Sequence, residues 1–282
     1  MRAVLWLLCA ALLPVAAQKA RPVRWQITPE EVSQGGSVRV DVWVSGAVRG
    51  ARAVFGGRPV ILYRIPGGYR GFAGTGPNTP PGHALVRVQV GLAGRKVHLQ
   101  YPVRVRLGRF GVRYLRVPPK MLDPQLAAYE RRRVRQAMAA PLGQPVWDGA
   151  FRLPVPGRVV SAYGVRSVYN GVPWGRHLGL DLQAARGTPV RAAQHGVTVL
   201  AERLPLGGNT VLVDHGAGVF TSYLHLESVA VRVGQPVRAG QVVGAVGSTG
   251  LSTAPHLHWG VWVNGVLVDP LPWTVEGPLA RP

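Results

Sequence analysis

The 282-residue sequence contains a single cysteine, Cys9, and this residue lies in an apolar N-terminal stretch. The remainder of the chain can therefore form no disulfide, cysteine nucleophile or thiolate metal site. Any metal ion must accordingly be held by histidine and carboxylate side chains.

Lysine and acidic residues are also scarce, whereas arginine is abundant. The chain has 33 Lys and Arg against 12 Asp and Glu, a formal net charge of +21, and its lysines are Lys19, Lys96 and Lys120. Such a charge attracts polyanions, although a genome rich in G and C would produce the same excess of arginine. No nucleic-acid-binding module is recognisable, so we expect no nucleic-acid partner and favour an anionic cell envelope.

The N-terminal apolar run is too short for an ordinary membrane-spanning helix. Arg2 precedes apolar residues 3–14, and small residues 15–17 follow them. This pattern predicts a signal peptide over residues 1–17, with an uncleaved anchor as the alternative. We therefore expect an exported monomer without a further transmembrane span, located in the periplasm or cell envelope or outside the cell.

Residues 22–107 alternate apolar and polar residues with the period of a β-strand. In SVRVDVWV, Val38, Val40 and Val42 share one face, and Arg39 and Asp41 share the other. Similar segments follow at 84–92 and 96–107, separated by turns rich in Gly and Pro. The pattern predicts an immunoglobulin-like β-sandwich without a catalytic constellation, which would serve as an accessory domain.

A helix is predicted between two β-rich regions. Asp123 and Pro124 have the residue types of an N-cap and a first helical position. Residues 120–142 are therefore expected to form a linker helix with a basic, solvated face. From 150 to 275, short apolar segments alternate with glycine turns, which predicts a compact all-β barrel or sandwich.

The most informative segment is HLHWGV at 256–261, an apolar run that contains two histidines. Side chains alternate faces along a strand, so His256 and His258 would point the same way while Leu257 and Trp259 point into the core. Two histidines on one polar face of an exported protein are typical of a metal hydrolase.

A second pair, His177 and Asp181, lies four residues apart in RHLGLDL. An extended strand would separate these residues by about 13 Å, too far for both to reach one ion. We therefore expect the chain to bend near Gly179, with His177 on a loop and Asp181 entering a strand.

The fifth candidate, His225, lies in GVFTSYLHLE at 218–227. Strand alternation predicts that Phe220, Leu224 and Leu226 face the core, and that Thr221, Tyr223 and His225 face the other side. A catalytic zinc usually has three protein ligands and one open position. Three ligands and two acid/base or oxyanion partners would use all five candidates, but spacing alone does not divide them.

These motifs resemble those of the M23 family, the lysostaphin- or LytM-type zinc metallopeptidases. The resembling segments follow in family order: GRHLGLD (175–181), GTPVRAA (187–193), GNTVLVDHGAGVFTSYLHL (208–226) and STAPHLHWGVWVNGVLVDPLPW (252–273). The resemblance implies the glycine-rich hybrid β-fold of these peptidases for residues 150–275. It also implies one Zn²⁺ ion held by His177, Asp181 and His258.

The same resemblance implies that His225 and His256 are the catalytic pair around a zinc-activated water. The implied reaction is hydrolysis of peptide bonds in bacterial peptidoglycan, in stem peptides or cross-bridges. In the family, the loop before the first ligand can contribute a tyrosine, and Tyr169 is the only nearby candidate.

Three alternatives are weighed against an active peptidase. A non-catalytic LytM-like module, which would bind the wall or activate a hydrolase, typically lacks a zinc ligand, and here all five positions are kept. A lipoyl- or biotin-type carrier needs an acceptor lysine, but no lysine follows Lys120. A glycosidase needs two paired carboxylates, and no second acid is suitably placed beside Asp181. His195 and His215 precede glycines and are interpreted as structural residues that lie in turns.

Overall fold

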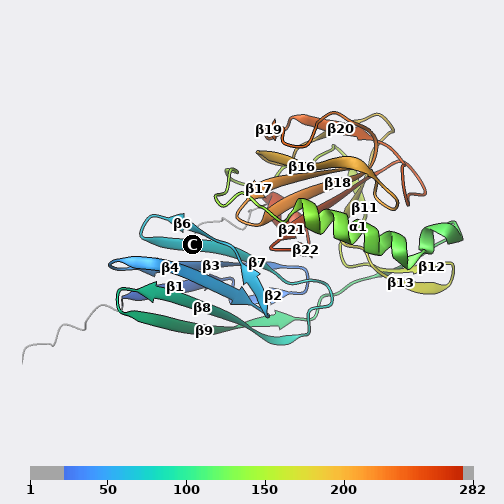
Figure 1. Cartoon of the computed structure of the whole chain (residues 1–282). Helices are drawn as coiled ribbons and strands as arrows, with labels where there is room; N and C mark the ends of the chain where they lie inside the picture. The colour runs from blue at the N-terminus through green and yellow to red at the C-terminus, as the bar shows by residue number, and fades with distance from the viewer. Residues whose placement is uncertain (1–21, 276–282) are drawn as a thin grey trace, which may run out of the picture.

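The computed structural model describes residues 22–275, which form two β-rich halves joined by a helical segment (Figure 1). The predicted signal peptide, residues 1–17, lies outside the described residues. In the part of the chain that the structure describes, no helix is long and apolar enough to cross a membrane.

The N-terminal half consists of two sheets. The first has the strand order β1 (Val23–Thr28), β3 (Ser37–Val44), β7 (Gly68–Gly74), β6 (Leu62–Ile65). The second has the order β2 (Glu31–Ser33), β9 (Arg95–Arg106), β8 (Gly82–Leu92), β4 (Val48–Phe55), β5 (Arg58–Val60). Residues of both sheets contribute to one apolar core. We propose residues 22–107 as an accessory domain of the immunoglobulin-like type.

The predicted apolar face of β3 is buried, but its polar face is buried as well. Val38, Val40 and Val42 lie in the core as expected. Arg39 and Asp41 are also buried, and Asp41 accepts hydrogen bonds from Arg39 Nε at 2.8 Å and from the guanidinium of Arg70 on β7. A buried carboxylate is tolerated here because it is paired.

The connection between the halves contains β10 (Val112–Leu115), a short 3-10 helix (Pro119–Leu122) and α1 (Pro124–Ala137). The Asp123 carboxylate accepts a hydrogen bond from Gln125 N at 2.8 Å, and Pro124 begins the helix, as the sequence predicts. Helix α1 packs with Val134, Ala137 and Met138 against a small apolar cluster on the C-terminal sheet. It is shorter than the predicted range of 120–142.

The C-terminal half is built on a ten-stranded sheet. Its main path is β11 (Arg158–Ser161), β14 (Leu180–Gln183), β21 (Leu257–Val263), β18 (Val219–Val229), β17 (Gly208–Gly216), β16 (Gly196–Leu204), β19 (Pro236–Val237). The other members are β15 (Pro189–Arg191), β20 (Val242–Val246) and β22 (Val266–Val268). A separate sheet has the order β10, β12 (Arg166–Tyr169), β13 (Val172–Arg176), and α2 (Leu271–Val275) closes the fold.

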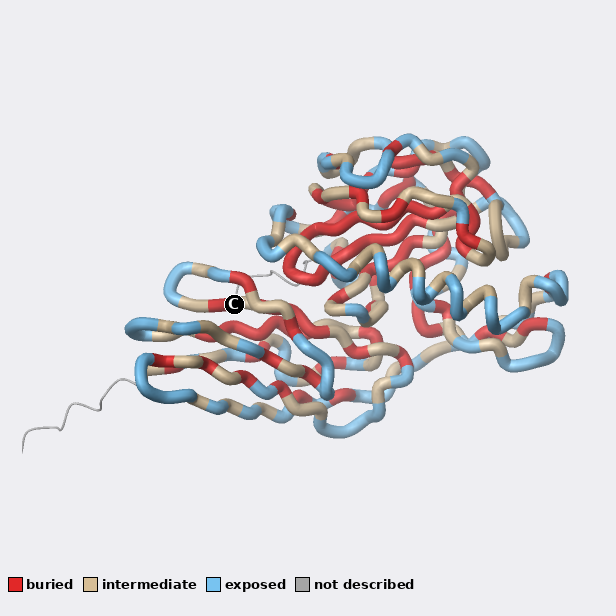
Figure 2. The backbone as a smooth tube through the Cα atoms, viewed as in Figure 1, coloured by how far each residue is buried: buried red, intermediate tan, exposed pale blue. Residues whose placement is uncertain are grey.

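Buried segments of both halves are red in Figure 2, and Tyr63 and Phe72 of the N-terminal half belong to the apolar core of the C-terminal half. Phe72 of the N-terminal half packs against Trp147 and Trp273 of the C-terminal half. Asn264 accepts a hydrogen bond from Ile61 N at 3.1 Å and donates one to the carbonyl of Phe72. The N-terminal half is therefore packed onto the C-terminal half rather than tethered by a free linker.

A buried histidine, His215, lies in the core of the C-terminal half. Its interpretation as a turn residue is wrong, because it lies within β17 and is inaccessible to solvent. Its Nδ1 donates to the carbonyl of His195 at 2.6 Å, and its Nε2 lies 2.8 Å from the hydroxyl of Thr221. Burial lowers the pKa of His215 to about 4.

We expect the protein to lose stability in acid partly through His215. The unfolded chain binds a proton on this imidazole near its ordinary pKa of 6.5, whereas the folded chain does so only near pH 4. Its contribution to stability is therefore complete above pH 6.5 and is lost as the pH falls toward 4, by about 3 kcal/mol in total. Urea titrations at pH 7 and pH 5 should show that this acidification lowers the free energy of unfolding of His215→Gln less than that of the wild type, by about 2 kcal/mol. The control is His98→Gln, on an exposed position of β9; equal losses in wild type and His215→Gln would contradict the assignment.

Candidate active site

The predicted bend between His177 and Asp181 is present at Gly179. His177 lies on the loop after β13, and Asp181 lies in β14. A Cβ atom at position 179 would fall 2.5 Å from the carbonyl oxygen of Trp259 and 2.7 Å from Nε2 of His258. Glycine is thus required for close approach to β21, and this approach brings His177 beside its partners.

The register of two strands then brings Asp181 and His258 together. Strands β14 and β21 pair so that Asp181 lies opposite His258. Asp181 Oδ1 is 2.8 Å from His258 Nδ1 and 2.7 Å from His177 Nε2, and the two nitrogens are 2.9 Å apart. One oxygen and two nitrogens therefore converge on a single point, and each could donate an electron pair to a cation.

The tautomer of His177 is set by its other ring nitrogen. Nδ1 lies 2.8 Å from the carbonyl oxygen of Ala162, to which it donates, so in the neutral ring Nε2 carries a lone pair. That lone pair faces the Asp181 carboxylate and His258 at less than 3 Å. Such contacts between acceptors are favourable only with a proton or a metal cation between them. Two imidazoles and one carboxylate are a donor set that suits Zn²⁺.

The charge balance at this cluster also favours a cation. Burial raises the pKa of Asp181, but the adjacent imidazoles of His177 and His258 outweigh burial and hold this pKa well below its ordinary value. Burial lowers the pKa of His258. Asp181 is therefore ionised and His258 favours its neutral form near neutral pH, which are the states needed for metal ligation.

His225 reaches the same site, although the predicted faces of its strand are reversed. In β18, Leu224 lies opposite His258 and lines the groove, whereas Tyr223 pairs with Trp259 in the core. His225 then adopts φ +63°, a left-handed conformation that interrupts the strand alternation. Leu224 and His225 thus both line the groove, and the prediction that placed Tyr223 on the polar face is wrong.

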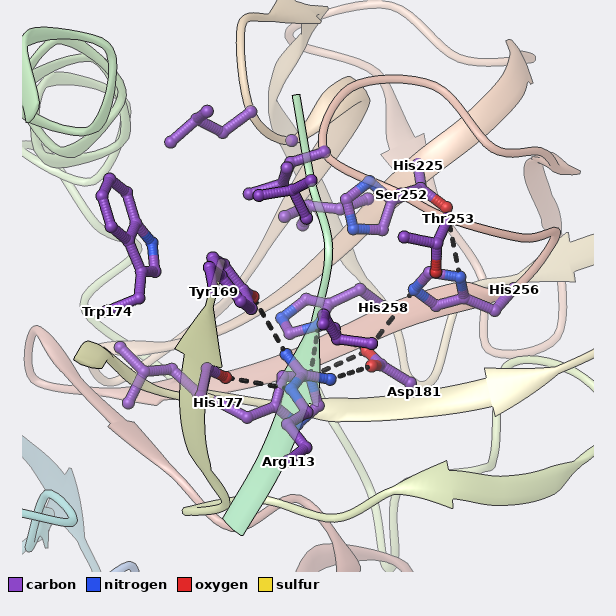
Figure 3. Close-up of a pocket in the computed structure, with 18 of the residues that line it drawn as sticks. Arg113, Tyr169, Trp174, His177, Asp181, His225, Ser252, Thr253, His256 and His258 are labelled. Atoms are coloured by element: carbon purple, nitrogen blue, oxygen red, sulfur yellow. Dashed lines mark hydrogen bonds and ion pairs between the residues drawn. The ribbon is translucent and has the colours of Figure 1, made fainter. Parts of the chain in front are cut away.

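His225 and His256 lie side by side next to the three-residue cluster (Figure 3), with ring centroids 4.9 Å apart. Each ring donates from Nδ1 to a backbone carbonyl at 2.8 Å, His225 to Thr249 and His256 to Ala254. His256 Nε2 lies 3.6 Å from Asp181 Oδ1. Burial lowers the pKa of His225 to about 3, so this ring is neutral near neutral pH. With Nδ1–H engaged in this way, Nε2 of a neutral ring is a hydrogen-bond acceptor.

The groove around these five residues contains side chains that the sequence analysis missed. Arg113 of β10 contacts Asp181 (Figure 3), and Glu130 of α1 accepts hydrogen bonds from the backbone N–H groups of Leu206 and Gly207 at the groove edge. Burial raises the pKa of Glu130. Both residues lie outside the β-rich segments that carry the motifs, and no local pattern in the sequence points to them.

Tyr169, the tyrosine singled out from the sequence, also lines the groove. Its ring stacks on Trp174 of the same hairpin, with centroids 6.0 Å apart and an interplanar angle of 23°. Its hydroxyl lies 3.4 Å from Arg113 Nη2. The pair forms an aromatic wall opposite the segment that contains Ser252 and Thr253 (Figure 3).

Comparison with known proteins identifies the fold and the family. The profile of Peptidase family M23 matches residues 175–270. The crystal structure of an M23-type peptidase from Pseudomonas aeruginosa is 30% identical, covers 88% of this chain and 96% of its own chain, and superposes with a TM-score of 0.65. The chain belongs to peptidase family M23. The fold predicted from the sequence is confirmed as that of an M23 peptidase.

Two curated relatives each match part of this chain. The DD-carboxypeptidase/endopeptidase Mpg of Neisseria meningitidis is 43% identical over 114 residues, which are 40% of this chain and 26% of Mpg. The peptidoglycan DD-endopeptidase ShyC of Vibrio cholerae is 41% identical over 105 residues, 37% of this chain and 24% of ShyC. This chain thus spans about a quarter of the length of these curated relatives.

Proposed function

We propose that this M23 peptidase is an exported zinc metalloendopeptidase that hydrolyses peptide bonds in bacterial peptidoglycan. The observation that carries the proposal is the convergence of His177 Nε2, Asp181 Oδ1 and His258 Nδ1 within 2.9 Å of one another. These three atoms would hold one Zn²⁺ ion. A zinc ion bound there would lower the pKa of water to about 7 and polarise the carbonyl group of the substrate.

His225 and His256 are suited to moving the proton of the attacking water. In each ring the Nδ1–H group donates to a carbonyl, which leaves Nε2 free to accept a proton. The ring that takes up the proton becomes a donor and can return the proton to the leaving amine nitrogen. Because both rings have the same hydrogen-bonding pattern, their geometry supports a shared role without ranking them.

Peptidoglycan is the substrate that the relatives support. ShyC, by its name, is a DD-endopeptidase of peptidoglycan, and the proposed bond here is likewise an amide in a stem peptide or cross-bridge. The formal charge of +21 is compatible with a wall that carries many carboxylates. Action on peptidoglycan agrees with export to the cell envelope, and we propose that the protein acts there as a monomer.

Digestion of purified cell walls tests the proposal directly. We expect the protein to release soluble wall fragments by cleaving one type of peptide bond, and mass spectrometry of the muropeptides obtained from them with a muramidase identifies that bond. Chelation of the metal should reduce release by about 10³-fold, because the metal supplies several kcal/mol of transition-state stabilisation. Added Zn²⁺ should restore it.

A non-catalytic LytM-like module is the second candidate, and the same digestion separates the two. Such a module would bind walls and leave the muropeptide pattern unchanged with zinc bound. The presence of all five site residues in one groove favours the enzyme. Metal analysis of the purified protein, performed on the same sample, shows whether the absence of products reflects an empty site.

A further inference from the structure

Arg113 reaches the active site from the connection between the two halves of the molecule. Arg113 lies on β10, which pairs in parallel with β12 from Val112 opposite Arg166 to Leu115 opposite Tyr169. Just beyond β10, the side chain of Asn170 bonds both the N–H and the carbonyl of Val117, at 3.0 and 2.8 Å. The segment that carries Arg113 is therefore fixed onto the hairpin that forms one wall of the groove.

The guanidinium of Arg113 is enclosed by four hydrogen-bond acceptors. Nη1 donates to Asp181 Oδ2 and to Ser161 Oγ, both at 3.0 Å, Nε donates to Ser167 Oγ at 2.9 Å, and Nη2 donates to Tyr169 OH at 3.4 Å. Three of the acceptors are neutral hydroxyls. Among residues 22–275, Asp181 is its one ion-pair partner. Arg113 and its three hydroxyl partners all precede the segment that matches the family profile, residues 175–270, whereas Asp181 lies within it.

The two oxygens of Asp181 therefore have different partners. Oδ2 is taken by Arg113, whereas Oδ1 faces His177 and His258. With one oxygen bound to a rigid, planar donor, the carboxylate cannot rotate to present both oxygens to the same point. We propose that Arg113 is a positioning residue that fixes Asp181 so that a single oxygen is presented to the metal. The inference rests on the proposed function.

Arg113 has two opposing effects on a bound cation. Its positive charge repels the metal ion, whereas its hydrogen bonds hold the metal ligand in place. The hydrogen bonds to three hydroxyls indicate that holding Asp181 in place is the larger effect. An arginine that only neutralised the charge of Asp181 would need no contact with Ser161, Ser167 or Tyr169. Loss of an outer partner of a metal ligand typically weakens metal affinity by about 10- to 100-fold.

Zinc affinities of variants distinguish the two effects, because lysine keeps the charge but lacks the planar fork of donors. We expect Arg113→Lys and Arg113→Ala both to weaken zinc binding by about 10- to 100-fold, measured by competition with a chromophoric chelator. Arg116→Lys and Arg116→Ala, at an exposed arginine just after β10, should bind zinc as the wild type does. In the Co²⁺-substituted protein, the visible spectrum should change in the Arg113 variants alone, because Asp181 becomes free to offer both oxygens.

The proposal is overturned if Arg113→Ala binds zinc as tightly as the wild type or more tightly, since charge repulsion would then dominate. It is also overturned if Arg113→Lys keeps wild-type affinity and spectrum, since charge alone would then suffice. Thermal unfolding of the metal-free variants confirms that they are folded before affinities are compared. Failure of the wild type to bind zinc or cobalt would instead refute the proposed function, which separates the two failures.

Discussion

Replacing Asp181 with alanine is expected to abolish zinc binding and to lower the release of soluble wall fragments by about 10³-fold or more. Asp181 supplies the one negative charge of the cluster, and its Oδ1 is within 2.8 Å of both histidine nitrogens. Without it, two neutral imidazoles would have to hold a divalent ion beside the cationic Arg113. The loss of several kcal/mol of metal-derived stabilisation corresponds to the expected change in rate. Metal content after dialysis and product release measure the two effects.

The matched control is Asp148→Ala, since the Asp148 side chain is 88% exposed and lies away from the groove. This control should retain zinc and activity. Asp181→Asn adds a second comparison, because asparagine keeps the shape and loses the charge. An Asp181→Ala protein that retains stoichiometric zinc would show that the carboxylate is no ligand, and would require a different set of donors.

Much of this site could be predicted because the relevant geometry is local. A strand places His256 and His258 on one side of the chain, and the chain must bend to bring His177 and Asp181 together. Both consequences follow from strand dimensions, and the bend is present at Gly179. The burial of Leu257 and Trp259 follows from the same alternation. The allocation of roles among the five residues came from the family resemblance and stays a proposal.

The incorrect predictions arise where long-range contacts override a local pattern. Alternation counted back from His225 predicts a polar face for Tyr223, but the left-handed conformation of His225 interrupts this alternation, and Tyr223 lies opposite Trp259 in the core. The burial of Asp41 is tolerated because Arg70, on the neighbouring strand β7, pairs with it. Arg113 reaches Asp181 only because β10 joins the hairpin β12–β13. Arg70 and Asp41 are 29 residues apart and Arg113 and Asp181 are 68 apart, and hydrophobic periodicity contains no information about such partners.

The second large effect concerns the two histidines beside the cluster. His225→Ala and His256→Ala are expected to retain zinc but to lose activity by about 10²- to 10⁴-fold, the usual contribution of a general acid or base. In the wild-type protein, each of these two rings lies beside the metal-ligand cluster and donates from Nδ1 to a backbone carbonyl. Neither ring belongs to the cluster itself, which consists of His177, Asp181 and His258. His258→Ala, by contrast, should lose zinc and activity together. Zinc content and product release from each purified variant give the comparison.

His98→Ala serves as the control, since this histidine is exposed on β9 and should leave both quantities unchanged. The decisive pair is His256 and His258, because the two lie one residue apart and both approach Asp181 Oδ1, at 3.6 and 2.8 Å. If His256→Ala lost the metal while His258→Ala kept it, the ligand and the proton-transfer residue would have to be exchanged. Loss of zinc in both variants would instead mean that four side chains hold the ion, leaving His225 alone to move the proton.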